Sequence, residues 1–192
     1  MPDNGASQFA AGVLYGYTGR VTDERDYIDG CMTHDKTIDR GLSKGFKSYQ
    51  KGKTQKGSKQ IFGTFDAYGE AMASCEKTNP SFEKWSEEKD AFFAQENWAQ
   101  IVKAHYIPRK EYFDTEEGYM LKSWENGEYF QAGMFWAEIW AGLTSIQPEP
   151  TVDDSNLDDT TQAEWIAGVL FGSSGRVTDK RDYILGCMKH DD

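Results

Sequence analysis

Apolar residues recur three and four positions apart along most of the first three quarters of the chain, which is the spacing of an amphipathic helix. The pattern predicts a short helix over 8–17, with Ser7 as its N-cap, and a long helix over roughly 23–50. Gly12 and Gly16 lie four residues apart in the short helix. Such a pair forms a small-residue face, so we expect another helix to approach the short helix closely there.

The Lys- and Gly-rich segment 51–59 is expected to be an exposed loop, and a further helix is expected over about 60–77. Two helices joined by such a loop form an antiparallel hairpin. The residues expected to be buried on the second of them are Ile61, Phe65, Tyr68, Met72 and Cys75.

Further helices are predicted within 82–105, over 110–124 and over 128–143. The last of these is apolar nearly all round, which is typical of a helix in the middle of a bundle. The alternation that marks strands does not occur, so the predicted fold is all-α, a helical bundle of five to seven helices. Large rings are expected to fill much of its core, including those of Trp85, Trp98, Trp124, Trp136, Trp140 and Trp165.

The strongest signal in the sequence is an internal duplication. Residues 12–35 align with residues 168–191 at an offset of 156 without a gap, and six of the 24 aligned positions differ, which leaves 18 identical. Most differences are mild. Asp29, which becomes Leu185, is the exception, and it suggests a face whose neighbour differs between the two copies.

The duplication predicts three parts: a complete helical unit over 1–146, a linker over 147–162, and the start of a second unit over 163–192 with a duplicated opening helix pair. The linker is rich in Pro, Thr and acidic residues and has no helical period, so we expect it to be extended. Its composition also suggests O-linked sugars at Thr151, Ser155, Thr160 and Thr161.

Three cysteines fit this division. The offset carries Cys31 onto Cys187, whereas Cys75 has no counterpart. If Cys31 pairs with Cys75, Cys187 is the first half of a second bridge, whose other half would lie in an absent or neighbouring unit. The alternative is three reduced, buried thiols in a cytosolic protein.

Charge and motifs exclude several function classes. The net charge of −11 argues against a nucleic-acid partner, which needs a basic face to displace phosphate counterions, and no run of 18 apolar residues predicts a membrane span. The repeated His34-Asp35 and His190-Asp191 supply one His per unit, too few for a zinc cluster, so a core or helix-end histidine is favoured. Nucleophile motifs, phosphate-binding glycine loops and CxxC pairs do not occur. We therefore expect no cofactor, no metal ion and no enzymatic activity.

Several short motifs carry a resemblance: an F-x-x-G opening helix at Phe9 and Gly12, the cysteines Cys31 and Cys75, and the segment 126–133, NGEYFQAG. In this order they resemble a class of secreted, cysteine-paired, all-α proteins of ciliates and other protists. The resemblance implies an extracellular, disulfide-bonded protein and transfers no catalytic residue. Because no signal peptide is recognisable, the sequence is expected to be a mature or excised piece.

A partial helical repeat cannot bury its apolar face alone, so we expect residues 165–191 to dock on a neighbouring unit as 9–35 dock on their own. The expected contact residues are Trp165, Gly168, Leu170, Phe171, Gly172, Tyr183 and Cys187. A head-to-tail contact of this kind does not close on itself and generates a filament. The sequence thus predicts a self-assembling structural protein, a repeat unit of an extracellular filament or tandem-repeat polymer. The alternative is a soluble helical binding module with an internal apolar cavity for a lipid or other apolar ligand.

Overall fold

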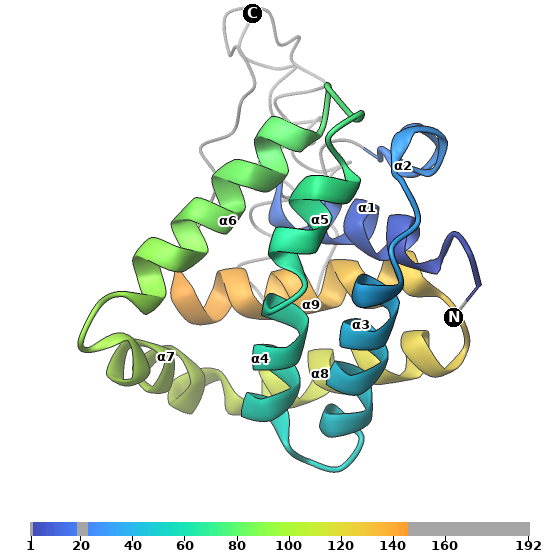
Figure 1. Ribbon diagram of the computed structural model, residues 1–192. Helices are drawn as coiled ribbons and strands as arrows, with labels where there is room; N and C mark the ends of the chain where they lie inside the picture. The colour runs from blue at the N-terminus through green and yellow to red at the C-terminus, as the bar shows by residue number, and fades with distance from the viewer. Residues whose placement is uncertain (1, 19–22, 146–192) are drawn as a thin grey trace, which may run out of the picture. The chain divides into compact units, whose positions relative to one another are not determined.

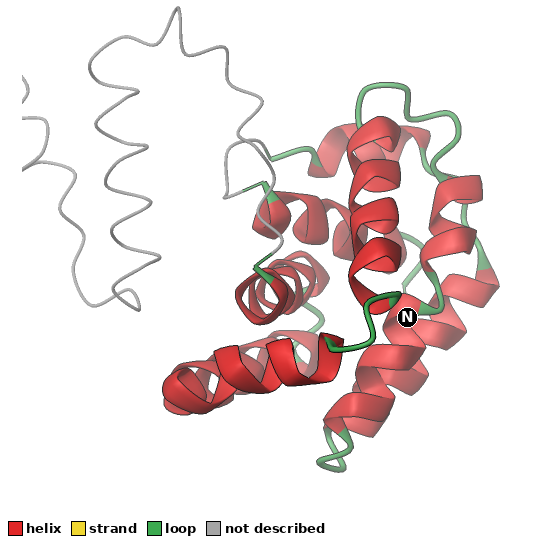
Figure 2. Cartoon of the chain, turned by 90° about the vertical axis from the view of Figure 1, so that its left-hand side faces the viewer, coloured by secondary structure: helices red, strands yellow, loops and turns green. Residues whose placement is uncertain are grey.

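The computed structural model describes residues 2–18 and 23–145, which belong to one compact unit, and every regular element in these ranges is a helix (Figure 2). The all-α helical bundle is confirmed. The elements are α1 (Gly5–Tyr17), α2 (Arg25–Cys31), α3 (Lys36–Tyr49), α4 (Thr54–Phe62), α5 (Phe65–Ala71), α6 (Asn79–Phe93), α7 (Trp98–Tyr106), the 3-10 turn η1 (Ile107–Arg109), α8 (Lys110–Glu125) and α9 (Tyr129–Thr144).

Helix α9 is central to this unit. It packs against α1 over most of the length of α1, against the following helix α8, and against α7 (Figure 1). Helices α3 and α4 form the expected antiparallel hairpin, and α5 packs between α3 and α6. The nearly all-apolar sequence of α9 therefore corresponds to the middle position that was predicted for it.

Aromatic rings fill the core. Trp136 of α9 is completely buried, and the rings of Phe62, Phe65 and Trp85 surround it at centroid distances between 4.8 and 5.8 Å. Trp124 and Trp140 pack against the same cluster. The core role expected for the tryptophans is confirmed for Trp85 and Trp136, and Trp124 and Trp140 are partly buried against the same core. Trp98 is partly buried but does not belong to this core, so the expectation is wrong for it.

The long helix predicted over 23–50 is wrong, because Met32–Asp35 interrupt it and divide it into α2 and α3. At the break, the backbone N–H of Thr33 donates to the carbonyl of Ala71 at 2.9 Å instead of continuing a helix. The Asp35 carboxylate then accepts a hydrogen bond from the Thr37 N–H and caps α3. An interaction with a distant segment therefore overrides the helical period here.

The predicted loop over 51–59 is also shorter than expected, since α4 already begins at Thr54. The lysines of this segment are exposed, as predicted, but Gly57 is buried against α3. A Cβ on Gly57 would lie 2.4 Å from Cδ2 of Tyr49, so a glycine is needed for the two helices to approach. The helix predicted over 60–77 is divided in turn at Gly63–Thr64, yet its five expected core residues are all buried.

Candidate docking site

The opening helix α1 crosses α9 with their backbones in direct contact. An added Cβ would lie 1.9 Å from the Phe130 carbonyl oxygen at Gly12, 2.4 Å from the Met134 oxygen at Gly16, and 2.2 Å from the Phe9 oxygen at Gly133. No side chain larger than hydrogen fits at these positions. The close approach predicted from the spacing of Gly12 and Gly16 is confirmed, and Gly133 of α9 completes it.

Around this crossing, the side chains of α1 enter the core. Phe9 is completely buried and contacts the rings of Phe46, Trp124 and Trp136 at centroid distances of 5.8, 6.4 and 6.2 Å. Ala10, beside it, is also completely buried. Both side chains are enclosed by the packed core, so the size of the residue at each position affects how well α1 fits.

At the C-terminal end of α1, Tyr17 connects the helix to α6. Its hydroxyl donates to the carboxylate of Glu88, and its ring lies 5.1 Å from that of Trp85. Burial, together with the adjacent Glu88 carboxylate, raises the pKa of Tyr17 well above its usual range. Tyr17 therefore stays protonated and acts as a buried hydrogen-bond donor.

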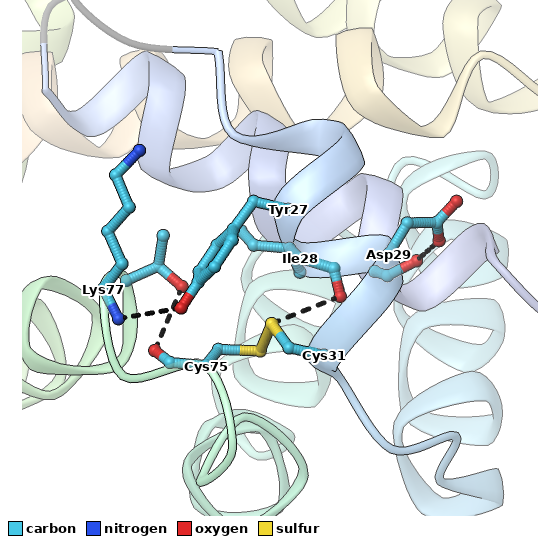
Figure 3. The surroundings of a disulfide bond; sticks show 8 residues. Tyr27, Ile28, Asp29, Cys31, Cys75 and Lys77 are labelled. Carbon is cyan, nitrogen blue, oxygen red and sulfur yellow. Dashed lines mark hydrogen bonds between the residues drawn. A yellow bond between two sulfur atoms is a disulfide. The ribbon is translucent and has the colours of Figure 1, made fainter.

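Helix α2 is attached to the turn after α5 by a disulfide between Cys31 and Cys75, whose Cα atoms are 5.2 Å apart (Figure 3). Figure 3 also shows Tyr27 above this bridge, where its hydroxyl accepts the backbone N–H of Lys77 at 3.1 Å. The Lys77 ammonium lies 2.7 Å from the carboxylate of Glu24. One covalent bond and two polar contacts thus connect α2 to the same turn.

Helices α1 and α2 are also connected to each other. The Ser7 hydroxyl donates to the Asp29 carboxylate, and Asn4 Nδ2 lies 3.5 Å from it. Ser7 is therefore not the N-cap that was predicted, because α1 begins earlier, at Gly5. A cavity of about 240 Å³ beside this contact is lined partly by Asp3, Asp29 and His34, so its lining is not the purely apolar one expected of a lipid site.

His34 lies in the break before α3, where it is exposed. Its Nε2 is 3.5 Å from the carboxylate of Asp39 and its Nδ1 is 3.3 Å from the backbone oxygen of Asp3. It occupies a helix end rather than a seam of the core. Within the described ranges, no three His, Cys, Asp or Glu side chains converge as metal ligands would, and no helix has the length and apolar character to cross a membrane.

The predicted contact residues of the second copy lie outside the described residues, as do the four candidate O-glycosylation sites. Their counterparts in the first copy are Phe9, Gly12, Leu14, Tyr15, Gly16, Tyr27 and Cys31. The structure brings these together in α1 and α2, where Leu14 is buried and Tyr15 contacts Phe130 at 5.3 Å. The sequence does not predict the contacts Tyr17–Glu88, Glu24–Lys77 and Ser7–Asp29, because a helical period does not indicate which distant residue lies opposite.

No protein-family model, no curated protein and no solved structure matches this chain. The resemblance to secreted proteins of protists, which rests on short motifs, therefore stays a prediction.

Proposed function

We propose that this protein is a structural, self-assembling one: a repeat unit of an extracellular filament or tandem-repeat polymer, in which the copy of the opening helix pair connects one unit to the next. The observation that carries the proposal is the docking of α1 and α2. The first copy is held by a glycine crossing and a disulfide, and the second copy retains the glycines and the cysteine as Gly168, Gly172 and Cys187.

The second copy needs a partner for physical reasons. In the first copy, the apolar residues of α1 are almost all buried by other helices of the unit. A helix pair with nearly the same side chains would expose that surface if it stayed undocked, at a cost of about 25 cal/mol for each Å² of apolar area. Docking on the α9 of a further unit would bury this surface in the manner of a solenoid repeat.

The same chemistry supports an extracellular location. The disulfide that fixes α2 persists in oxidising compartments and is rare in the cytosol. The cavity beside Ser7 gives no support to the alternative of a lipid-binding module, since carboxylates contribute to its lining.

The test is a two-unit chain in which residues 36–145 follow directly after Asp191. Residues 163–191 should then complete a second unit, in which Cys187 pairs with the added copy of Cys75. Peptide mapping should show two disulfides, and the added segment should resist proteolysis. Chains of three or more such units should appear in negative-stain images as rods whose length grows by a constant step per unit.

A matched control replaces Gly168 and Gly172 by Leu in the two-unit chain, which prevents a close approach to α9. This control should leave the added segment sensitive to protease. If the added segment stays unfolded and Cys187 stays a free thiol without these leucines, the second copy is not a docking element and the proposed function is wrong.

A further inference from the structure

The two copies of the opening pair agree at the glycines that contact the backbone of α9 and at the cysteine, and they differ at several positions where the first copy contacts other side chains of its own unit. The agreement is plain at Gly12, Gly16 and Ile28, which recur as Gly168, Gly172 and Ile184. The two glycines allow close contact with the backbone of a helix such as α9, and the Ile is the buried residue of α2. Docking on any unit of this fold would require both features. The second copy thus keeps the general features of docking.

The ion pair between Glu24 and Lys77 is not kept in the second copy. Glu24 lies 2.7 Å from the ammonium of Lys77, and its counterpart is Lys180. If the second copy occupied this site, two ammonium groups would face each other. Such juxtapositions of like charge act against a wrong partner.

The contact with α6 is not kept either. Tyr17 donates to Glu88 and fills space beside the ring of Trp85, whereas its counterpart is Ser173. Tyr17 is 3% exposed, so a serine there would leave a void against Trp85. Local relaxation compensates only partly for a missing ring in a packed core, so the void destabilises it.

At two positions in the core, the side chain of the second copy is larger than that of the first, whereas it is smaller at Ser173. Phe9 and Ala10 are completely buried, and their counterparts Trp165 and Ile166 are larger. The space around Phe9 is already occupied by the rings of Phe46, Trp124 and Trp136. Larger side chains would displace those rings, which destabilises a packed core.

A polar contact between α1 and α2 changes as a pair. Ser7, which donates to Asp29, becomes Ala163, while Asp29 becomes Leu185. A polar pair is replaced by an apolar pair, so the two helices of the second copy remain suited to each other. Random loss of function would not change both partners together.

From these contacts, and resting on the proposed function, we infer that residues 163–191 dock on a helical unit of this fold that is not identical to residues 2–145. That partner unit keeps a glycine at the α9 crossing and a cysteine for Cys187. It has an acidic side chain in place of Lys77, more space around positions 165 and 166, and a larger side chain opposite Ser173. The second copy therefore does not displace α1 and α2 from their own unit, and assembly follows an order of units instead of an exchange between equal ones.

The test is a competition within the full chain. The protein is refolded in a glutathione redox buffer, and mass spectrometry of its disulfide-linked peptides measures whether Cys75 is bonded to Cys31 or to Cys187. In the natural chain we expect Cys31 to be preferred by at least about tenfold, whether Cys187 comes from the same or another molecule. A variant with Trp165→Phe, Ile166→Ala, Ser173→Tyr and Lys180→Glu should bring the two pairings to similar amounts.

A control variant with Glu164→Gln, Ser174→Thr and Lys189→Thr restores first-copy residues away from these contacts, and it should keep the preference of the natural chain. Similar amounts of the two pairings in the natural chain would overturn the inference. So would an unchanged preference in the four-residue variant, since the named contacts would then not decide the pairing. The two-unit chain tests the proposed function separately. Because no first copy competes for the added site there, residues 163–191 should still dock on it, although less stably than they would with the four substitutions. Failure to dock contradicts the proposed function, whereas equal stability with and without the four substitutions contradicts only this inference.

Discussion

A Cβ atom on Gly12 would lie 1.9 Å from the backbone carbonyl oxygen of Phe130, in the middle of the crossing between α1 and α9. Both sides of this overlap are backbone, so a change of rotamer cannot relieve it. The helices would have to separate, and the ring contacts of Phe9 would open with them. The packing of the opening helix pair, α1 and α2, therefore depends on a single glycine at this crossing.

Replacing Gly12 by Ala should consequently lower the unfolding free energy by about 3 kcal/mol or more, even though Ala favours helices. Urea unfolding followed by circular dichroism measures this effect. The matched control is Gly30→Ala in α2, where an added Cβ meets nothing within 4 Å, and a small gain in stability is expected. A Gly12→Ala protein as stable as the natural one would disprove the close crossing.

The disulfide between Cys31 and Cys75 closes a loop with a sequence separation of 44, so it should stabilise the unit by about 4 kcal/mol through the entropy of the unfolded chain. Cys75→Ser should show this loss in urea unfolding without reductant, and added reductant should then have little further effect. Cys187→Ser is the control and should leave the stability of the unit unchanged. Three titratable thiols in the natural protein under oxidising conditions would contradict the pairing.

The helices and their buried sides were predictable because a helical period is a local property of the sequence. All five core residues expected in 60–77 are buried, although the helix itself is divided after Phe62. The breaks were not predictable. The one at Thr33 depends on a hydrogen bond to Ala71, which lies 38 residues away.

The candidate site shows the same division. The spacing of Gly12 and Gly16 predicts a close helix crossing, which the structure contains. The sequence places Gly57 in a loop instead, because glycine is common both in loops and at close helix contacts. Which side chains lie opposite α1 and α2 could not be derived. Tyr17 and Glu88, for example, are 71 residues apart and share no motif. Contacts of that kind are fixed by tertiary packing, and they distinguish the two copies.

Tyr49 should make stability depend on pH in the alkaline range. It is 3% exposed, its hydroxyl lies 2.5 Å from Ser58 Oγ, and burial raises its pKa from 10.0 to about 12. The folded protein holds this proton more tightly than the unfolded chain does. The contribution is therefore complete below pH 10 and is lost as the pH rises from 10 towards 12, by about 2–3 kcal/mol.

Tyr49→Phe removes this titration and isolates the effect. Below pH 10 the natural protein should be more stable than the variant by about 1 kcal/mol, the typical value of a hydrogen bond. Above pH 10 the difference in stability should shrink and change sign, because only the natural protein has the hydroxyl of Tyr49 to titrate. The other buried tyrosines titrate in both proteins, so their effects cancel. Unfolding free energies measured at pH 8 and pH 11 check this, and a difference that stays constant with pH would refute it.

Ser7 and Asp29 should be energetically coupled, since the hydroxyl of the first donates to the carboxylate of the second. Ser7→Ala and Asp29→Leu should each lower the unfolding free energy by about 1 kcal/mol, because each leaves a polar partner behind. The double variant reproduces the residues of the second copy, and it should lose less than the sum of the single losses by about 1 kcal/mol. Urea unfolding of the four proteins measures the coupling, and Ser7→Ala combined with Asp66→Leu on α5 should be additive. If the losses for Ser7 and Asp29 were additive as well, the paired change to Ala163 and Leu185 would not preserve a contact equivalent to that between α1 and α2. The suitability of the second copy's helix pair for docking on a further unit would then lose this support.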